Sequence, residues 1–268
     1  MNMQPNKILD EKLWEMHLTR QFNWTIHLRK MLYDKADMKN MGKILDVGCG
    51  IGLISKEIHE LSKIEVHGID INEKLIEKAK EKFPDGKFIV GKAEEMPYDD
   101  NTFDCTFCQF LLMWIKHPFQ VLLEMKRVTK PGGKIICAAE PDYGGKIDYP
   151  DDYNAVPATI RAIMNEGADP FYGRKLKATF ARVGMKFEIG VSAELWDDET
   201  MKREFEHVWE FAQASAKNDM MKSWAKAIEK RDREALEKGE RITFLPLFWG
   251  IGNKEKETKN FASEEMGK

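Results

Sequence analysis

The sequence predicts an α/β protein whose core is a doubly wound, mostly parallel sheet with helices on both faces. From Lys43 to Glu140, short apolar runs alternate with charged stretches of helical period, which is typical of strand–helix–strand units. The apolar runs are KILDVG, EVHGID, KFIVG, FDCTFCQF and KIICAAE. They are almost continuous, as expected for strands that helices cover on both sides. With 268 residues, 43% of them hydrophobic, the chain can bury a core of this size.

The sequence predicts further elements before this core and within it. Residues 1–40 place apolar side chains at helical spacing, so we expect an N-terminal helical cap. The core itself, residues 41–193, carries a loop insertion at residues 141–170, where Gly, Pro, Asp and Tyr are dense. Near its end we expect a helix from Arg174 to Val183 that Gly184 closes, and then a strand from Met185 to Val191.

The chain then returns to charged sequence of helical period. Residues 194–240 predict a helical insertion, and residues 241–253 contain the last strand of the core. Because Pro246 cannot donate a hydrogen bond to a strand ladder, the safer span for this strand is Phe248 to Asn253. Residues 254–268 are rich in Lys and Glu, and we expect a disordered charged tail.

Composition narrows the classes of partner. A net charge of −3 gives no overall attraction to nucleic acid, so we expect a small-molecule partner. No apolar run reaches the roughly 20 residues of a membrane span, and the first residues lack a secretory signal, so we expect a cytoplasmic protein. The four cysteines, Cys49, Cys105, Cys108 and Cys137, lie in segments that predict burial, so we expect reduced thiols and no metal site. The oligomeric state is not predicted.

The strongest local motif is Asp46-Val47-Gly48-Cys49-Gly50-Ile51-Gly52, a strand that runs into a glycine turn and then a helix. Glycines let the backbone adopt positive φ and come close to a ligand, while the start of the helix offers unpaired amides. Dinucleotide-binding enzymes use G-x-G-x-x-G. Here the third glycine, Gly52, comes one position early, and Leu53 stands where the third glycine of that motif would be. The pattern therefore disfavours NAD as the cofactor.

A carboxylate follows the next strand at the position where ribose is bound in related folds. Asp70 lies 18 residues after Gly52, at the end of EVHGID, and can accept hydrogen bonds from two ribose hydroxyls. Ile71 would then form an apolar platform for adenine. The alternative role for Asp70 is to cap the helix that begins near Glu73, but Asn72 fits that role better.

With these motifs in order, the sequence resembles the class I S-adenosylmethionine-dependent methyltransferases, in the branch that includes the ubiquinone and menaquinone C-methyltransferases. The resemblance rests on LDVGCGIG, on GID at residues 68–70, on AEEMPYDDNTFD at 93–104 and on KRVTKPGG at 126–133. It implies a Rossmann-like fold with a seven-stranded sheet, and S-adenosylmethionine as the cofactor.

The same resemblance implies which residues bind the cofactor. Ala93 and Glu94 would contact adenine, and the glycine turn would contact the methionine part together with Gln109 and Phe110. Within the turn region the implied binding residues are Asp46, Gly48, Cys49, Gly50 and Gly52. Two departures from the family pattern stand out. Lys92 replaces the acid that many relatives have before the Ala-Glu pair, and Met113-Trp114-Ile115 replaces a His-His pair, so no base is implied there.

Methyl transfer from a sulfonium is an in-line displacement that depends mainly on positioning, and it needs a general base only if the acceptor loses a proton. The sequence identifies no catalytic residue. Candidates for contact with the acceptor follow the carboxyl ends of two strands: Glu140, Asp142, Tyr143 and His117. Each has a structural alternative, such as a turn former for Asp142, a packed aromatic for Tyr143 and a surface residue for His117.

These observations favour methyl transfer to a small organic acceptor. An RNA or protein methyltransferase would need a basic, aromatic-bearing stripe, whereas the basic runs here alternate with acids. A non-catalytic cofactor-binding module would keep the turn and Asp70 but lack an acceptor cavity. The N-terminal aromatic cluster, which is Trp14, His17, Phe22, Trp24 and His27, forms either a lid or part of the core.

Overall fold

The main sheet has seven strands in the order β3-β2-β1-β4-β5-β9-β7, in a computed structural model that describes residues 11–150, 155–192, 196–214, 216 and 218–256. Its strands are β1 (Lys43–Val47), β2 (Glu65–Asp70), β3 (Lys87–Val90), β4 (Phe103–Gln109), β5 (Thr129–Pro141), β7 (Lys186–Ser192) and β9 (Leu247–Asn253). Neighbouring strands from β3 to β5 are parallel, and β9 is antiparallel to both β5 and β7. The predicted α/β class and the mostly parallel, seven-stranded sheet are confirmed.

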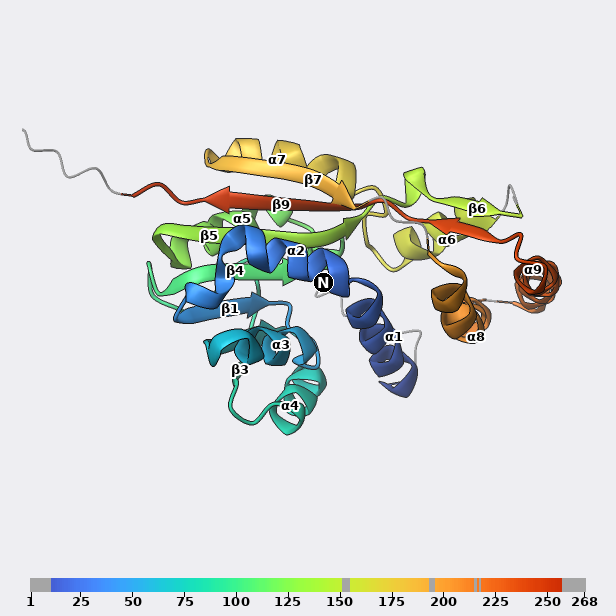
Figure 1. Cartoon of the computed structure of the whole chain (residues 1–268), viewed down its shortest axis with the longest axis horizontal. Coiled ribbons are helices and arrows are strands. Elements are labelled where there is room, and N and C mark those ends of the chain that lie inside the picture. Colours follow the sequence, from blue (N-terminus) through green and yellow to red (C-terminus); the bar gives the residue numbers. More distant parts are fainter. Residues whose placement is uncertain (1–10, 151–154, 193–195, 215, 217, 257–268) are drawn as a thin grey trace, which may run out of the picture.

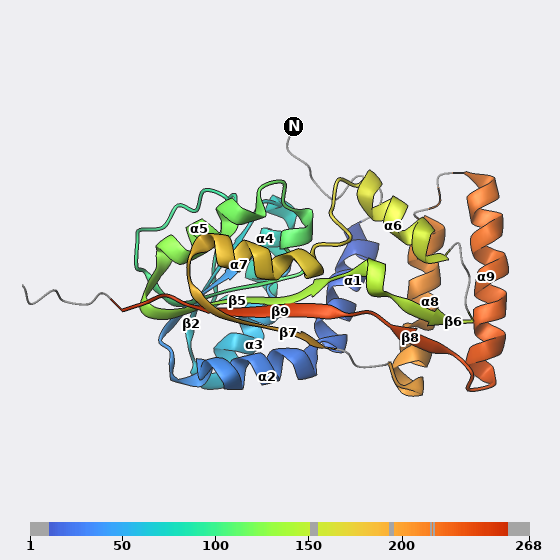
Figure 2. The same cartoon turned by 90° about the horizontal axis from the view of Figure 1, so that it is seen from above.

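Helices cover both faces of this sheet (Figure 2). The helices are α1 (Glu11–Trp24), α2 (Ile26–Ala36), α3 (Leu53–Ser62), α4 (Glu73–Lys82), α5 (Pro118–Val128), α6 (Ala155–Asn165), α7 (Leu176–Val183), α8 (Asp198–Ala214) and α9 (Asp219–Glu237). One buried cluster joins α2, α3 and α4 to the sheet through residues such as Leu32, Ile58 and Ile76. A second cluster joins α5 and α7 to the opposite face through Leu122 and Phe180. Burial of both faces explains why the strands read as continuous apolar runs.

Local sequence explains where several helices begin and end. Asn72 caps α4, because its side chain accepts hydrogen bonds from the amides of Lys74 and Leu75. Pro118 occupies the first turn of α5, where a missing N–H costs nothing. Gly184 ends α7 in the left-handed conformation at φ 67°, as the sequence predicts.

The strand order reverses between β1 and β4, so a crevice is expected outside the carboxyl ends of these strands. Figure 1 shows α1, α6, α8 and α9 beyond that edge of the sheet. Helices α8 and α9 lie within the expected helical insertion and share a small core of their own, which contains Phe205, Trp209 and Ile228. The cap elements therefore gather where a ligand is expected to bind.

The predicted loop insertion contains regular structure that the sequence did not reveal. Residues Ile147–Tyr149 form strand β6, which pairs in antiparallel fashion with β8 (Ile242–Phe244). Turn-forming residues on both sides of β6 dominate the local pattern, and its partner lies far away in the sequence. The last core strand, β9, begins at Leu247, one residue before the predicted span.

The C-terminal boundary also differs from the prediction. Lys254 was expected to begin the charged tail, but its backbone N–H donates to the carbonyl of Gly133 at 3.0 Å, and its carbonyl accepts from the amide of Gly132 at 2.8 Å. Lys254 therefore belongs to the folded core, because it continues the pairing of β9 with β5. The rest of the predicted tail from residue 257 lies outside the described residues, as do residues 1–10 of the predicted N-terminal cap.

All four cysteines are buried free thiols, in agreement with the predicted packing role. Among the described helices, none combines the length and the apolar character that crossing a bilayer requires.

Candidate cofactor and acceptor site

The glycine turn after β1 is held tightly against neighbouring elements. The amides of Gly48 and Cys49 both donate to the carbonyl of Ile69, at 2.8 and 3.1 Å, which ties the turn to the end of β2. Gly48 has φ 73°, and a Cβ there would lie 2.8 Å from Leu111 of the loop after β4. Gly50 has φ 51°, and a Cβ there would lie 3.4 Å from Leu18 of α1. The positive φ at both positions favours glycine.

Asp70 orients the same turn from the end of β2. Its Oδ2 accepts the amide of Gly50 at 2.9 Å, and its Oδ1 accepts the amide of Asn72 at 2.9 Å. Burial raises the pKa of this carboxyl group, and the two amides oppose the shift. Because an ionised carboxylate offers about four acceptor positions, each oxygen keeps the capacity to accept a further hydrogen bond.

Three residues of the predicted cofactor set lie beneath the turn and outside the cavity described below. Asp46 is 2% exposed and accepts a hydrogen bond from Ser55 Oγ at 2.6 Å, and burial raises its pKa to about 7. Gly52 caps the start of α3 at φ 76°, and Cys49 is buried. These residues support the shape of the turn from below.

A cavity of about 920 Å³ opens outside the carboxyl ends of β1, β2 and β4. Most of the predicted site residues line it: Gly48, Gly50, Asp70, Ile71, Ala93, Glu94, Gln109, Phe110 and His117. The topology therefore brings together motifs that are up to about 70 residues apart in the chain.

Gln109 lines this cavity, and its amide oxygen lacks a hydrogen-bond partner among the described residues. Its Nε2 donates to Thr25 Oγ1 at 3.1 Å, which fixes the amide, while its Oε1 is buried without a partner among the described residues. Thr25 is itself held in place, because its hydroxyl donates to the carbonyl of Gln21 at 2.5 Å and accepts from Arg29 at 2.6 Å. A buried acceptor of this kind points to a ligand donor as its partner.

The structure places three of the four candidate acceptor residues away from the cavity. Glu140 is fully buried, and its carboxylate accepts the amides of Leu111 and Leu112 through Oε1, at 3.2 and 3.0 Å, and that of Met113 through Oε2, at 3.2 Å. Burial raises the pKa of Glu140 to about 7. Glu140 therefore shapes the loop after β4 instead of facing a substrate.

Asp142 and Tyr143 are likewise structural in this arrangement. Asp142 forms a two-point ion pair with Arg174, in which Arg174 Nη2 lies 2.7 Å from Oδ1, and it also accepts the amide of Gly144 at 3.0 Å. Tyr143 packs against the second core cluster, and burial raises its pKa to about 12. His117 alone of the four lines the cavity.

The rest of the cavity wall includes Trp14, a member of the aromatic cluster that the sequence analysis named as a lid or part of the core, and four residues that were not predicted to line a site. Trp14 of α1 and Trp114 of the loop after β4 meet edge to face, with ring centroids 6.3 Å apart. Thr179 and Arg182 of α7 and Glu166 after α6 complete this part of the wall. No local motif marks Trp114, Thr179, Arg182 or Glu166 as site residues, and the packing of distant elements brings them to the crevice.

In the N-terminal aromatic cluster, Trp14 lines the cavity, whereas Phe22 and Trp24 make packing contacts. Trp14 lines the cavity, and His17 stacks on it at 5.4 Å, where burial lowers the pKa of His17 to about 3. Phe22 packs under the Arg29 guanidinium at 4.2 Å, and Trp24 stacks on Phe110 at 6.1 Å. Helix α1 is also joined to α8, through Arg20 and the buried carboxylate of Glu204 at 2.5 Å.

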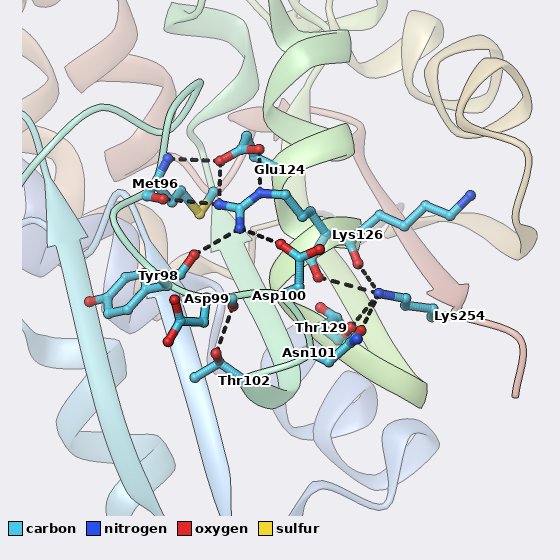
Figure 3. Close-up of polar contacts among 11 residues, drawn as sticks. Met96, Tyr98, Asp99, Asp100, Asn101, Thr102, Glu124, Lys126, Thr129 and Lys254 are labelled. Carbon is cyan, nitrogen blue, oxygen red and sulfur yellow. Dashed lines mark hydrogen bonds and ion pairs between the residues drawn. The ribbon is translucent and has the colours of Figure 1, made fainter. Parts of the chain in front are cut away.

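Arg127 of α5 fastens the loop between β3 and β4 to that helix through hydrogen bonds to loop residues. Figure 3 shows the loop residues Met96, Tyr98 and Asp100 close to Glu124 of α5. The Arg127 guanidinium binds both oxygens of Glu124 at 2.7 and 2.8 Å and Asp100 at 2.8 Å. It also donates to the carbonyls of Tyr98 at 2.8 Å and Met96 at 3.0 Å. The first part of this loop, residues 92–95, lines the cavity. Arg127 therefore sets the position of a cavity wall that it does not itself touch.

Lys254 fixes the other end of the same loop (Figure 3). Its ammonium donates to Asn101 Oδ1 at 2.7 Å and to the carbonyls of Lys126 and Thr129 at 2.8 and 2.7 Å. These carbonyls end α5, where a positive charge is favourable.

Known proteins share this arrangement in sequence and in fold. A family model described as a methyltransferase domain matches residues 45–137. An uncharacterized methyltransferase of Schizosaccharomyces pombe is 33% identical over 183 residues, which cover 62% of this chain and 66% of that protein. A demethylmenaquinone methyltransferase of Renibacterium salmoninarum is 31% identical over 155 residues, which cover 56% of this chain and 65% of that protein.

The crystal structure of the YcgJ protein of Bacillus subtilis matches with a TM-score of 0.58 at 16% identity, over 87% of this chain and 99% of that chain, and it supports the fold. The chain spans just under two thirds of the length of the two sequence relatives described above. The matched segment contains the glycine turn, Asp70 and the loop that Arg127 holds. This segment is therefore similar to a methyltransferase domain, and the relatives at 31–33% identity are named as methyltransferases, in agreement with the resemblance that the sequence motifs show.

Proposed function

We propose that this protein transfers a methyl group from S-adenosylmethionine to a small organic acceptor. The observation that carries the proposal is that one cavity holds two different ends. The first consists of the glycine turn and Asp70, and the second includes the Trp14 and Trp114 pair and Thr179 and Arg182 of α7. A non-catalytic cofactor-binding module would need only the first end. The second end is apolar with a few polar groups, as small-molecule pockets are.

The residues of the first end fit the proposed cofactor. Asp70 keeps acceptor positions for the ribose hydroxyls, and Ala93 and Glu94 lie on the wall where adenine would bind next to Ile71. Gln109, which lines the same cavity, would contact the methionine part. Asp46, Cys49 and Gly52 would act by holding the turn from beneath.

When bound, the cofactor supplies a methyl group on a sulfonium, which is electrophilic without further activation. The chain must then hold the acceptor in line with the breaking bond and keep water away. Positioning of this kind can contribute about 7–11 kcal/mol to catalysis. Trp14, Leu18 and Gln21 of α1 would close the cavity from one side. His117 and Glu166 are the groups on the wall that could accept a proton from an acceptor that must lose one.

The test is to incubate the purified full chain with S-adenosylmethionine labelled in the methyl group and with a lysate separated into small-molecule, RNA and protein fractions. We expect label in the small-molecule fraction. Label confined to RNA or protein would refute the small-molecule acceptor. Binding of S-adenosylhomocysteine without labelling of any fraction would instead favour a non-catalytic module.

Arg127 provides a separate prediction about the adenine wall. Replacing Arg127 with methionine releases residues 96–100 from α5, so we expect affinity for S-adenosylhomocysteine to fall about tenfold, the equivalent of roughly 1.4 kcal/mol. Calorimetry should also compare S-inosylhomocysteine, in which oxygen replaces the adenine amine. Wild type should discriminate between the two ligands, and the variant should discriminate less.

The matched control is Lys130→Met, which breaks an ion pair with Asp104 at the amino end of β4, and neither residue lines the cavity. This variant should bind both ligands as wild type does. Undiminished discrimination in Arg127→Met would show that the loop keeps its shape without the guanidinium.

A further inference from the structure

The cavity of the proposed methyl transfer adjoins a second cavity of about 540 Å³. The two cavities share the wall formed by Ile115, Lys116 and Pro118 before α5 and by Thr179 and Arg182 on α7. None of Gly48, Gly50, Asp70 or Ala93 lines the second cavity. It therefore extends the acceptor end of the site and not the cofactor end.

The second cavity has an apolar floor and a cationic rim. Met113, Ala168 and Tyr172 are buried side chains of its floor. Its charged residues are Lys116, Lys175, Arg182 and Asp169. Lys175 pairs with Asp169 Oδ2 at 2.5 Å, and Asp169 Oδ1 accepts the amide of Phe171 at 3.1 Å. Asp169, the single acid that lines this cavity, therefore has a partner for each of its carboxylate oxygens.

The two remaining cations lie where the cavities meet. The Arg182 guanidinium packs over the Phe119 ring at 4.4 Å from its centroid, which holds the group at the start of α5. Within the described part of the chain, neither Lys116 nor Arg182 makes an ion pair. The first turn of α5 contains no acid, so the positive end of the helix dipole adds to the positive potential of Lys116 and Arg182. The acids on the wall of the first cavity are Asp70, Glu94, Glu95 and Glu166.

We propose that Lys116 and Arg182 bind an anionic group of the methyl acceptor, a carboxylate or a phosphate, at the junction of the two cavities. The proposal rests on the proposed methyl transfer and names the chemical class of its acceptor. A guanidinium binds either anion through two parallel hydrogen bonds, and the lysine adds a point charge. The apolar body of the acceptor would lie against Trp114 and Ile115, with its reacting atom toward the cofactor end.

The charge of the acceptor can be measured before its identity is known. A deproteinised small-molecule extract is passed over a strong anion exchanger at pH 7.5, and each fraction is assayed for label from methyl-labelled S-adenosylmethionine. We expect the acceptor to be retained and to elute with salt. Treatment of the retained fraction with alkaline phosphatase separates the two sources, because a phosphate acceptor would lose retention and a carboxylate acceptor would keep it.

Variants then test whether these two cations bind the anion. In Lys116→Met and in Arg182→Met, the amount of the retained fraction needed for half-maximal rate should rise about 10- to 100-fold, the loss expected for a charge-assisted hydrogen bond. The affinity for S-adenosylhomocysteine should stay within about twofold of wild type. Lys177→Met is the matched control, because Lys177 is an exposed cation of α7 that lines neither cavity, and it should behave as wild type.

Three results would overturn the proposal. An acceptor that flows through the exchanger has no anionic group for the cations to bind. Equal requirements for the acceptor in the variants and in wild type would remove Lys116 and Arg182 from its binding. Weakened binding of S-adenosylhomocysteine in both variants would assign the cations to the cofactor. If no small molecule takes up label at all, the proposed function itself fails, and that outcome is distinct from these three.

Discussion

Replacing Asp70 with alanine should weaken the binding of S-adenosylhomocysteine by about 1.5–3 kcal/mol, which is roughly 10- to 150-fold. The carboxylate has two tasks that one substitution removes together. It accepts the amides of Gly50 and Asn72, which shapes the glycine turn, and its remaining acceptor positions face the cavity. Isothermal titration calorimetry of the full chain measures the effect directly.

A ligand change separates these two tasks of Asp70. Loss of one ribose hydroxyl, as in the 2′-deoxy form of S-adenosylhomocysteine, should weaken binding to wild type but have little effect in Asp70→Ala. Glu65→Gln is the control, because Glu65 lies at the opposite, exposed end of the same strand. If the variant discriminates between the two ligands as wild type does, then Asp70 does not contact the ribose.

The sequence predicted those parts of the site whose conformation depends on residues close to them in the chain. Gly48 and Gly50 have positive φ, and the need for glycine at such positions is visible in the sequence. Asp70 ends β2 and Asn72 caps α4 two residues later, so their roles depend on the short turn between these elements. Strands buried on both faces also carry their own signature, which is why the sheet could be predicted from five apolar runs.

The parts that were not predicted depend on partners distant in the sequence. Glu140 lies near the carboxyl end of β5, at the expected edge, but its oxygens accept hydrogen bonds from amides 27–29 residues earlier in the chain. Asp142 is occupied by Arg174 in the same way. Arg182 reaches the crevice because α7 packs on α5, and nothing in its own neighbourhood in the sequence indicates this. A carboxylate at the right edge is therefore a weak predictor of substrate contact until its hydrogen-bond partners are known.

Removal of the Glu140 side chain should cause the largest loss of stability. In Glu140→Ala the amides of Leu111, Leu112 and Met113 lose their acceptor in a buried place, and an unsatisfied buried group costs about 1–3 kcal/mol. We expect the free energy of unfolding to fall by about 2–5 kcal/mol in urea titrations. The control Glu188→Ala, which removes one partner of an exposed ion pair with Lys35, should cost about 1 kcal/mol or less.

The same carboxylate should give the stability a distinctive pH dependence. Burial raises the pKa of Glu140 from 4.5 to about 7, so between these values the folded protein binds more protons than the unfolded chain does. Its contribution to the free energy of unfolding is therefore fully present below about pH 4.5 and is lost as the pH rises through about 7. Glutamine keeps an acceptor for the loop but cannot ionise, so the difference in unfolding free energy between wild type and Glu140→Gln should fall from pH 5 to pH 7.5 and then level off. Burial raises the pKa of Asp46 in wild type and in the variant alike, so the contribution of Asp46 to the pH dependence cancels in this difference. A difference that stays constant over the whole range would mean that Glu140 is ionised in the folded state even at pH 5, and the three amides would then outweigh the cost of burial.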